Sequence, residues 1–415
     1  YLTAALENAG FVVDFRDYQV NEFPDPFTSQ NILDYLKDPA LVVGFSCMAN
    51  LLPFTLLAMK AFHERYPDRF LILGGVGAKS VEERVLELCP WVNCISVGEA
   101  EFTGPELLRV IKEKGDLPRV PGLVCRDRQG RIVRTPARER LKNLDEGPLP
   151  AFHHIDLSKY QGYGVMTTRG CPYPCTFCSV APVWDHISTF RSNENILHEM
   201  RTLHEKAGVK LFLFQDEFFV CSKEKVLSFC RDLKQSGINL YWKAFGRVDM
   251  TDREMMTAMA EEGCVELRFG IESGSDRILS LVKKGFSAEQ AIIRVSEAVQ
   301  IFPRVDAFYM WGFPFETMED FHQTLFQMVS LRMMGARILP SLLCLLPQTE
   351  LFQTYRSEIP LEFCPELFPE YMITGHETST RSRVQIDPKH LPIFEFIKSN
   401  PDLFPGFFHM DLKGN

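Results

Sequence analysis

The sequence has no hydrophobic run long enough to cross a membrane, and it has no excess of positive charge. Its longest apolar stretches, such as the one around Leu342–Leu346, fall far short of the ~20 residues that a membrane-spanning helix needs. Lys and Arg number 45 against 54 Asp and Glu, so the formal net charge is −9. An acidic protein offers no general attraction for phosphate backbones or anionic lipid. We therefore expect neither a nucleic-acid partner nor a membrane span.

Cysteine is sparse as well, and no signal peptide is visible. Twelve cysteines in 415 residues are too few for a disulfide scaffold and favour a reducing cytoplasm. The sequence opens at Tyr1 and not at Met, so we expect a few native residues to precede it. The hydrophobic fraction of 46% and the charged fraction of 24% are typical of folded proteins. The length predicts two or three domains.

Residues 1–145 alternate helix-like and strand-like patterns. Apolar stretches at 11–15, 41–45, 70–73 and 94–97 are interspersed with helical spacing at 55–65, 81–88 and 105–114, and 122–133 is typical of a hairpin. Short apolar runs separated by helices indicate a parallel sheet that is covered on both faces. We predict a doubly wound, Rossmann-like α/β domain here, with its first strand upstream of Tyr1.

Residues 146–345 repeat this alternation over a longer stretch. Strands are predicted at 164–168, 210–215, 240–245, 265–270, 305–311 and 337–343, and helices at 194–206, 223–235, 252–261, 276–282 and 318–333. Six such units describe a partial (β/α)6 barrel of the TIM type, or else a long open sheet. Residues 346–415 are rich in Phe and have no clear period. They predict an irregular or helical extension that packs on the mouth of the barrel.

Three cysteines, Cys171, Cys175 and Cys178, form a C-x3-C-x2-C array directly after the first predicted barrel strand. Soft thiolate ligands select iron–sulfur clusters or zinc. Zinc usually takes four ligands, and no fourth Cys or His lies at a suitable short spacing. The array therefore predicts a cubic iron–sulfur cluster with one open iron; a zinc site or three unrelated buried thiols are the alternatives. Residues 141–156 are predicted to be the linker between the two domains, and we interpret His153 and His154 as contacts of this linker, and not as metal ligands.

The array, with the aromatic Phe177 just before its last cysteine, resembles the signature motif of the radical S-adenosylmethionine (SAM) enzymes. The resemblance implies that the open iron of a [4Fe–4S] cluster binds SAM. It also implies that one electron, from a donor such as flavodoxin or ferredoxin, cleaves SAM to methionine and a 5′-deoxyadenosyl radical.

The same resemblance implies SAM contacts at the ends of successive barrel strands. They are Asp216 and Glu217 for the amino group, Arg247 for the carboxylate, Glu272 for the ribose hydroxyls, and Gly312 and Pro314 for the adenine. A carboxylate suits a cationic amine, and a guanidinium fork suits a carboxylate. Taken singly, each of these has an ordinary alternative as a surface residue, an ion-paired residue or a turn.

The N-terminal domain resembles the cobalamin-binding domain of the cobalamin-dependent radical SAM enzymes. The matching segments, 44–50, 71–80 and 96–101, each follow a predicted strand, where ligands bind in such sheets. The resemblance implies a cobalamin surface made by Ser46, Gly74, Gly75, Gly98 and Glu99. The alternative is that Gly-Gly after a strand is only a common turn.

One motif of such domains, D-x-H-x-x-G, in which the His ligates cobalt, is missing. The only Asp-x-His, Asp320–His322, falls on a predicted barrel helix and lacks the Gly. We therefore expect cobalamin to bind without that histidine.

Together these resemblances imply a cytoplasmic methyltransferase that acts on an unactivated carbon of a small molecule or natural product. The 5′-deoxyadenosyl radical would remove a hydrogen from the substrate, and the substrate would take the methyl group of methylcobalamin. A non-methylating cyclase or oxidative rearrangement enzyme of the same architecture is the first alternative, and an iron–sulfur redox sensor that never cleaves SAM is the second.

Overall fold

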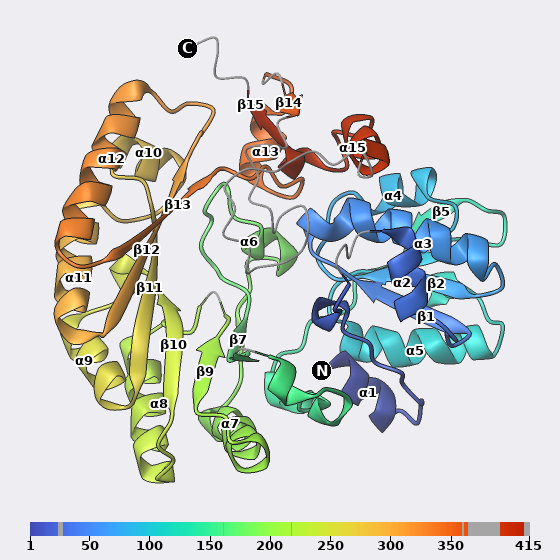
Figure 1. Ribbon diagram of the computed structural model, residues 1–415, viewed down its shortest axis with the longest axis horizontal. Helices are drawn as coiled ribbons and strands as arrows, with labels where there is room; N and C mark the ends of the chain where they lie inside the picture. The colour runs from blue at the N-terminus through green and yellow to red at the C-terminus, as the bar shows by residue number, and fades with distance from the viewer. Residues whose placement is uncertain (24–27, 161, 217, 359–360, 364–390, 411–415) are drawn as a thin grey trace. The chain divides into compact units, whose positions relative to one another are not determined.

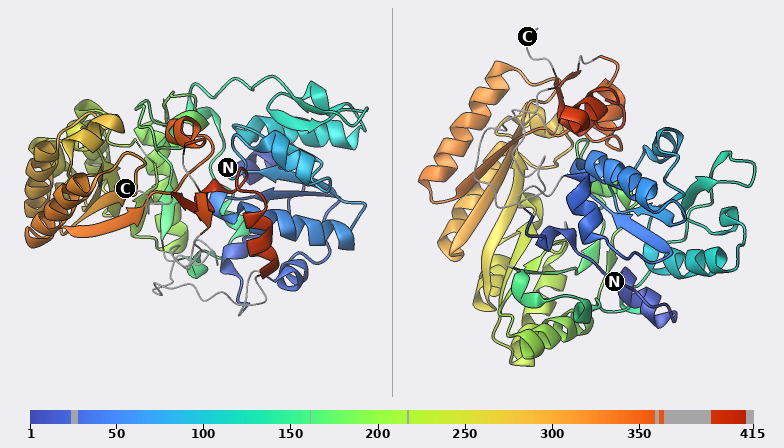
Figure 2. Two further views of the ribbon diagram at one scale, coloured as in Figure 1. Left: turned by 90° about the horizontal axis from the view of Figure 1, so that it is seen from above. Right: turned by 45° about the vertical axis from the view of Figure 1, so that its right-hand side comes forward.

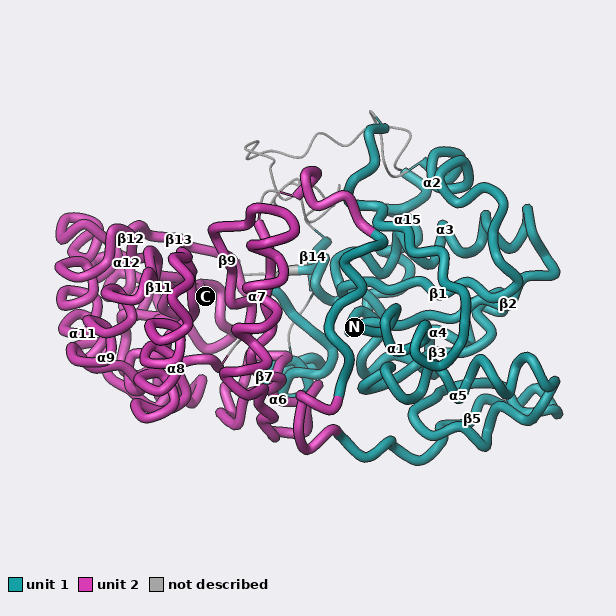
Figure 3. Tube along the Cα trace, turned by 90° about the horizontal axis from the view of Figure 1, so that it is seen from below, with its two compact units in different colours: residues 1–140, 147–154, 344–411 teal, residues 141–146, 155–343, 412–415 magenta. Residues whose placement is uncertain are grey.

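The computed structural model describes residues 1–23, 28–160, 162–216, 218–358, 361–363 and 391–410 (Figure 1). They form two compact units, shown in different colours in Figure 3. Unit 1 comprises residues 1–140 and 147–154 with the described part of 344–411, and unit 2 comprises 141–146 with the described part of 155–343. The two predicted α/β domains are present, and the C-terminal extension belongs to unit 1.

Unit 1 contains a five-stranded sheet in the order β1-β2-β3-β4-β5. Its strands are β1 (Val42–Ser46), β2 (Phe70–Gly74), β3 (Cys94–Ser96), β4 (Leu123–Arg126) and β5 (Ile132–Arg134). The first three run parallel, and the last two add an antiparallel hairpin. Three of the predicted strands and the predicted hairpin are confirmed.

The helices of unit 1 pack around this sheet, some against its strands and some against neighbouring helices. They are α1 (Leu2–Asn8), α2 (Ser29–Tyr35), α3 (Leu52–Arg65), α4 (Glu82–Leu88) and α5 (Ala100–Lys112). On α3, Leu56, Met59 and Phe62 recur at helical spacing and are fully buried. None of the described helices of either unit is both long and apolar enough to cross a membrane.

The apolar stretch at 11–15 does not form the predicted strand. Val12 is fully exposed, and Phe15 is 42% exposed. A strand persists where a neighbouring strand satisfies its backbone N–H and C=O groups. None of the described strands pairs with these residues. The apolar pattern alone was therefore not enough to form a strand here.

The described part of the Phe-rich extension completes the core of unit 1. It contains α13 (Glu350–Tyr355), β14 (Leu361–Phe363), α15 (Leu391–Lys398), a 3-10 turn η10 (Pro405–Phe407) and β15 (Phe408–Met410). Phe394, Ile397 and Phe404 are buried in the same apolar cluster as the face of α3, which α15 contacts (Figure 2). We predicted that this segment packs on the barrel; its large apolar side chains instead cover the N-terminal core.

Unit 2 is a six-stranded parallel sheet in the order β13-β12-β11-β10-β9-β6. The strands are β6 (Tyr163–Val165), β9 (Leu211–Phe214), β10 (Tyr241–Gly246), β11 (Cys264–Glu272), β12 (Arg304–Trp311) and β13 (Arg337–Leu342). Each strand lies beside the next along the chain, as in a barrel wall. The predicted partial barrel is confirmed.

Helices connect these strands and line the sheet (Figures 1 and 2). They are α7 (Asn193–Ala207), α8 (Lys223–Ser236), α9 (Arg253–Glu261), α10 (Asp276–Leu281), α11 (Ala288–Ile301) and α12 (Met318–Met333). Helix α11 has no counterpart among the predicted helices, although the sequence carries its start signal. Ser287 and Gln290 form a capping box, in which each side chain bonds the backbone of the other.

Candidate functional site

The three cysteines of the array lie on one loop of unit 2, between β7 (Thr168–Arg169) and α6 (Val180–Val183). Cys171, Cys175 and Cys178 are all half-buried, and none is in a disulfide. The backbone N–H of Cys178 donates to the carbonyl of Cys175 at 3.1 Å, which tightens the end of the loop. Burial raises the pKa of the Cys178 thiol to about 11. The loop follows the first barrel strand, at the edge where ligands bind in such folds.

The donor atoms of this loop fit an iron–sulfur cluster. The three thiols do not converge on a single ion. Within the described ranges, one group of three potential ligand atoms lies within 4.8 Å of one another, and the cysteines are not part of it. Thiolates that bind different irons of one cluster can stand farther apart. The buried hydroxyl of Thr176, inside the array, has no hydrogen-bond partner among the described residues, and a cluster sulfur would accept its proton.

Three consecutive backbone carbonyls, at residues 282–284, contact the cysteine loop and the neighbouring Arg247. The first accepts from the backbone N–H of Thr176 at 3.2 Å, and the second lies 3.8 Å from Sγ of Cys175. The third accepts from Nη2 of Arg247 at 2.5 Å. This segment follows α10 and connects the cysteine loop to Arg247; the sequence prediction did not include it.

Arg247 follows β10 and places a cation beside the cysteine loop. Its guanidinium carbon lies 3.4 Å from the ring centroid of Tyr173, and Nη1 lies 3.8 Å from Sγ of Cys175. Nε and Nη2 donate to the carboxylate of Asp249 at 3.0 and 3.1 Å. Burial opposes the charge, but the bond to Asp249 raises the pKa of Arg247. The guanidinium is therefore charged and fixed in orientation.

Glu272, the last residue of β11, is buried and forms an ion pair with Lys284. Nζ of Lys284 lies 3.0 Å from Oε1 of Glu272. The backbone of Glu272 has φ +75°, a conformation that non-glycine residues rarely adopt and that is common at functional sites. Lys284 Nζ also lies 5.7 Å from the ring centroid of Phe177. Lys284 was not among the predicted site residues.

Asp216 comes directly after β9 and is 3% exposed. Its carboxylate accepts the backbone N–H of Thr167 at 2.7 Å and also the Thr167 hydroxyl. These bonds fix the carboxylate between the ends of β6 and β9. The neighbouring predicted residue, Glu217, lies outside the described residues.

Gly312 and Pro314 form a turn directly after β12. Gly312 has φ +88°, and a Cβ there would lie 2.9 Å from Cδ1 of Leu342, so the turn requires glycine. Its N–H donates to the Glu316 carboxylate at 2.6 Å. The ring of Phe177 meets that of Phe313 edge-on, with centroids 6.2 Å apart. Phe177 thus contacts both the end of β12 and Lys284.

The predicted cobalamin-binding residues lie at the carboxyl edge of the sheet in unit 1. Ser46 ends β1, and Gly74 ends β2. Gly75 has φ +80°, and a Cβ there would lie 2.6 Å from the carbonyl oxygen of Cys47. The small size of Gly75 is therefore required by the packing of the loop after β2 against the loop after β1.

Gly98 and Glu99 lie between β3 and α5. Gly98 has φ +84°, and a Cβ there would have no atom within 4 Å. Only the backbone conformation requires glycine at this position, and the space that a Cβ would enter is open. Glu99 is buried and precedes the first residue of α5.

A small cavity in unit 1 lies at the loops after β1 and β2. Its volume is about 20 Å³, room for one water molecule. Its lining consists of Ala49, Asn50 and Gly77 from these loops and of residues that follow β13, namely Cys344, Leu346, Pro347, Leu403, Phe404, Pro405, Gly406 and Phe407. The extension therefore covers part of this edge, and a corrin ring would have to lie outside this cavity.

Both units match known protein families. Residues 1–108 match the B12 binding domain, and residues 165–328 match the radical SAM superfamily, whose matched range contains the cysteine array. The chain therefore combines a match to the B12 binding domain with a match to the radical SAM superfamily, which is the combination predicted from the sequence. The cofactors of the two domain families, a [4Fe–4S] cluster with SAM and cobalamin, are those predicted from the sequence.

Individual proteins support the same assignment. The chain is 31% identical to an uncharacterized methyltransferase of Pyrococcus horikoshii over 62% of its own length and 57% of that protein. It is 24% identical to the anaerobic magnesium-protoporphyrin IX monomethyl ester cyclase of Rubrivivax gelatinosus over 78% of its length and 60% of the cyclase. The chain thus spans less than two thirds of either relative.

The fold matches that of the radical SAM methyltransferase TsrM of Kitasatospora setae, solved with cobalamin and a [4Fe–4S] cluster bound. The TM-score is 0.70 at 18% identity, over 84% of this chain and 72% of TsrM.

Proposed function

We propose that this chain is a cobalamin-dependent radical SAM methyltransferase that methylates an unactivated carbon of a small molecule or natural product. The observation that carries this proposal is the presence, in one chain, of a B12 binding domain and of a three-cysteine loop at the strand ends of a radical SAM domain. The relation to proteins named as methyltransferases supports methyl transfer as the outcome.

When bound, the cluster and SAM supply a carbon radical, and cobalamin supplies the methyl group. Cys171, Cys175 and Cys178 would hold the cluster, and residues 282–284 contact their loop. The charged and fixed guanidinium of Arg247 would receive the SAM carboxylate.

The other predicted SAM contacts would act from neighbouring strand ends. The carboxylate of Asp216, with Glu217, would hold the amino group, and Glu272 would accept from the ribose hydroxyls. The turn at Gly312 and Pro314 would support the adenine. Support for this set comes from Phe177, whose ring lies near both Phe313 and Lys284 and thereby connects the cysteine loop to the ends of β11 and β12.

Cobalamin would lie at the carboxyl edge of the sheet in unit 1, near Ser46, Gly74, Gly75, Gly98 and Glu99. The open space above the left-handed Gly98 supports this position. The missing D-x-H-x-x-G motif supports binding without that histidine ligand.

We further propose a cytoplasmic location, an electron donor such as flavodoxin or ferredoxin, and no nucleic-acid partner. The described cysteines form no disulfide, which suits a reducing compartment. The net charge of −9 disfavours binding to nucleic acid.

The test uses the full chain, reconstituted without oxygen with iron, sulfide and cobalamin, and supplied with SAM that carries a deuterated methyl group. Loss of the methyl group from SAM leaves S-adenosylhomocysteine, and reductive cleavage leaves 5′-deoxyadenosine. A low-potential reductant is present throughout, because it must bring cobalamin to the Co(I) form that takes the methyl cation from SAM and must also supply the electron that cleaves SAM. We then expect deuterated methyl on cobalamin with S-adenosylhomocysteine, and also 5′-deoxyadenosine. The Cys178→Ala variant should lose 5′-deoxyadenosine. Absence of S-adenosylhomocysteine from the wild-type reaction would overturn the proposed methyl transfer.

The relation to the anaerobic cyclase, which spans 78% of this chain, supports a second candidate function. A non-methylating cyclase or rearrangement enzyme would form 5′-deoxyadenosine without S-adenosylhomocysteine. The same reaction therefore separates the two candidates. An iron–sulfur sensor would form neither product.

A further inference from the structure

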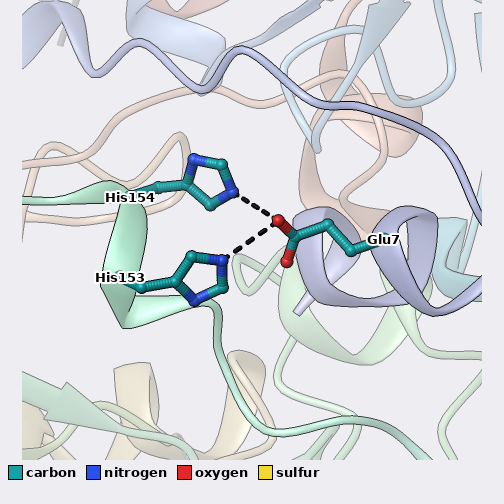
Figure 4. A group of neighbouring side chains, drawn as sticks. All are labelled: Glu7, His153 and His154. Carbon is teal, nitrogen blue, oxygen red and sulfur yellow. Dashed lines mark hydrogen bonds and ion pairs between the residues drawn. The ribbon is translucent and has the colours of Figure 1, made fainter.

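Three side chains outside the radical SAM site converge in unit 1. Oε1 of Glu7, on α1, lies 3.0 Å from Nε2 of His153 and 2.7 Å from Nε2 of His154 (Figure 4). The two histidines belong to the 3-10 turn η5 (Phe152–His154), where the chain leaves unit 1 for unit 2. The site therefore joins the first helix to a linker segment 146 residues away in sequence.

The geometry of these atoms suits a single metal ion. All three ligand atoms lie within 4.8 Å of one another, the only such group within the described ranges. Bonds of ~2.0–2.1 Å at tetrahedral angles place two ligand atoms about 3.3 Å apart. The observed separations of 3.0 and 2.7 Å need only small side-chain shifts to reach that value. The two imidazole rings are tilted by 39° with centroids 4.5 Å apart, so their Nε2 atoms face the same carboxylate.

The donor set indicates the class of metal. Two imidazoles with one carboxylate favour borderline transition ions such as Zn²⁺ over Mg²⁺ or Ca²⁺, which prefer oxygen ligands. The side chain of His153 is 66% exposed, which gives an ion and its remaining water ligands access to the site.

We propose that Glu7, His153 and His154 bind a divalent transition-metal ion of the Zn²⁺ class and thereby fasten the linker to α1. Each ring must present the lone pair of Nε2, so the proton that it shares with Glu7 moves to Nδ1 or leaves to solvent. The proposal is independent of the radical SAM chemistry, since none of its ligands belongs to that site.

The test measures zinc in the full chain, loaded with the cluster and free of an affinity tag. The cluster occupies the three cysteines of the array, so that zinc cannot bind there. Wild-type protein and the Glu7→Gln and His154→Ala variants are dialysed against micromolar Zn²⁺, and zinc and iron are counted by mass spectrometry. The His322→Ala variant is the matched control, because it removes an exposed imidazole from α12.

We expect about one more zinc per chain in the wild type and the control than in the two site variants. The zinc affinity of the two site variants should be at least about tenfold lower than that of the wild type, because even changes outside the direct ligands cause a loss of this size. Zinc should also raise the unfolding temperature of the wild type more than that of Glu7→Gln. Equal zinc contents in all four proteins, or no zinc in the wild type, would overturn the proposal and leave a hydrogen-bonded linker contact.

Discussion

Nζ of Lys284 lies 3.0 Å from Oε1 of Glu272, and both side chains are buried in unit 2. Glu272 ends β11, and Lys284 belongs to the segment 282–284 that contacts the cysteine loop. Lys284 supplies the cation for the buried Glu272 carboxylate and orients this carboxylate, which we propose for the SAM ribose.

Removing Lys284 should therefore destabilise unit 2 strongly. Lys284→Met leaves the Glu272 carboxylate buried without its cation, which costs about 3–5 kcal/mol in comparable pairs. The urea midpoint of unit 2, followed by tryptophan fluorescence, checks this. Lys223→Met is the control, because Lys223 pairs with exposed carboxylates and its loss should shift the midpoint far less. Equal midpoint shifts in the two variants would contradict the prediction.

Arg247→Lys should weaken SAM binding while the protein keeps its iron. Lysine retains the charge but loses the planar fork that bonds Asp249 and stacks on Tyr173. The loss of a charged hydrogen bond costs ~1.5–3 kcal/mol, which is at least a tenfold drop in affinity. Equilibrium dialysis of SAM together with an iron assay measures both quantities. Unchanged affinity would mean that Arg247 only supports the cysteine loop.

The Cys178 thiol should react slowly with iodoacetamide in the cluster-free protein. Burial raises its pKa from 9.0 to about 11, so below pH 9 it holds about a hundredfold less thiolate than an ordinary cysteine. Because the folded-state pKa is raised, this thiol's contribution to stability is complete below pH 9 and is lost as the pH rises through about 11. Peptide mass spectrometry across that range gives the titration. A reactivity midpoint near pH 9 would be inconsistent with the buried position.

Gly75→Ala should destabilise unit 1 more than Gly98→Ala. Both glycines have positive φ, which costs an alanine ~1–2 kcal/mol. At Gly75 the new Cβ would also lie 2.6 Å from the Cys47 carbonyl, whereas at Gly98 it would meet open space. The two unfolding temperatures, compared with that of the wild type, decide the order. If Gly98→Ala proves the more damaging, the loop packing described here is not what requires glycine at position 75.

Sequence reasoning succeeded where the signal is local. The cysteine array, the strands that precede it and the turn at Gly312 are each encoded in a short stretch, because strand periodicity and turn chemistry involve neighbouring residues. The order of these stretches also placed Asp216, Arg247 and Glu272 at successive strand ends.

It failed where distant residues decide the outcome. The apolar residues 11–15 resemble a strand, but a strand also needs a partner. Phe394 and Phe404 are apolar in sequence, yet only the fold shows that α3 is their neighbour. Glu7 and His154 are 147 positions apart, so no local pattern joins them. Lys284 was missed because only the fold brings it to Glu272.

The most direct test of the account counts both cofactors in one anaerobically reconstituted sample of the full chain. We expect about four irons and one cobalamin per chain after gel filtration. The iron should be lost in Cys171→Ala, Cys175→Ala and Cys178→Ala, and the cobalamin should be retained in all three. A colourless wild-type protein that holds zinc at these cysteines and no cobalamin would contradict it.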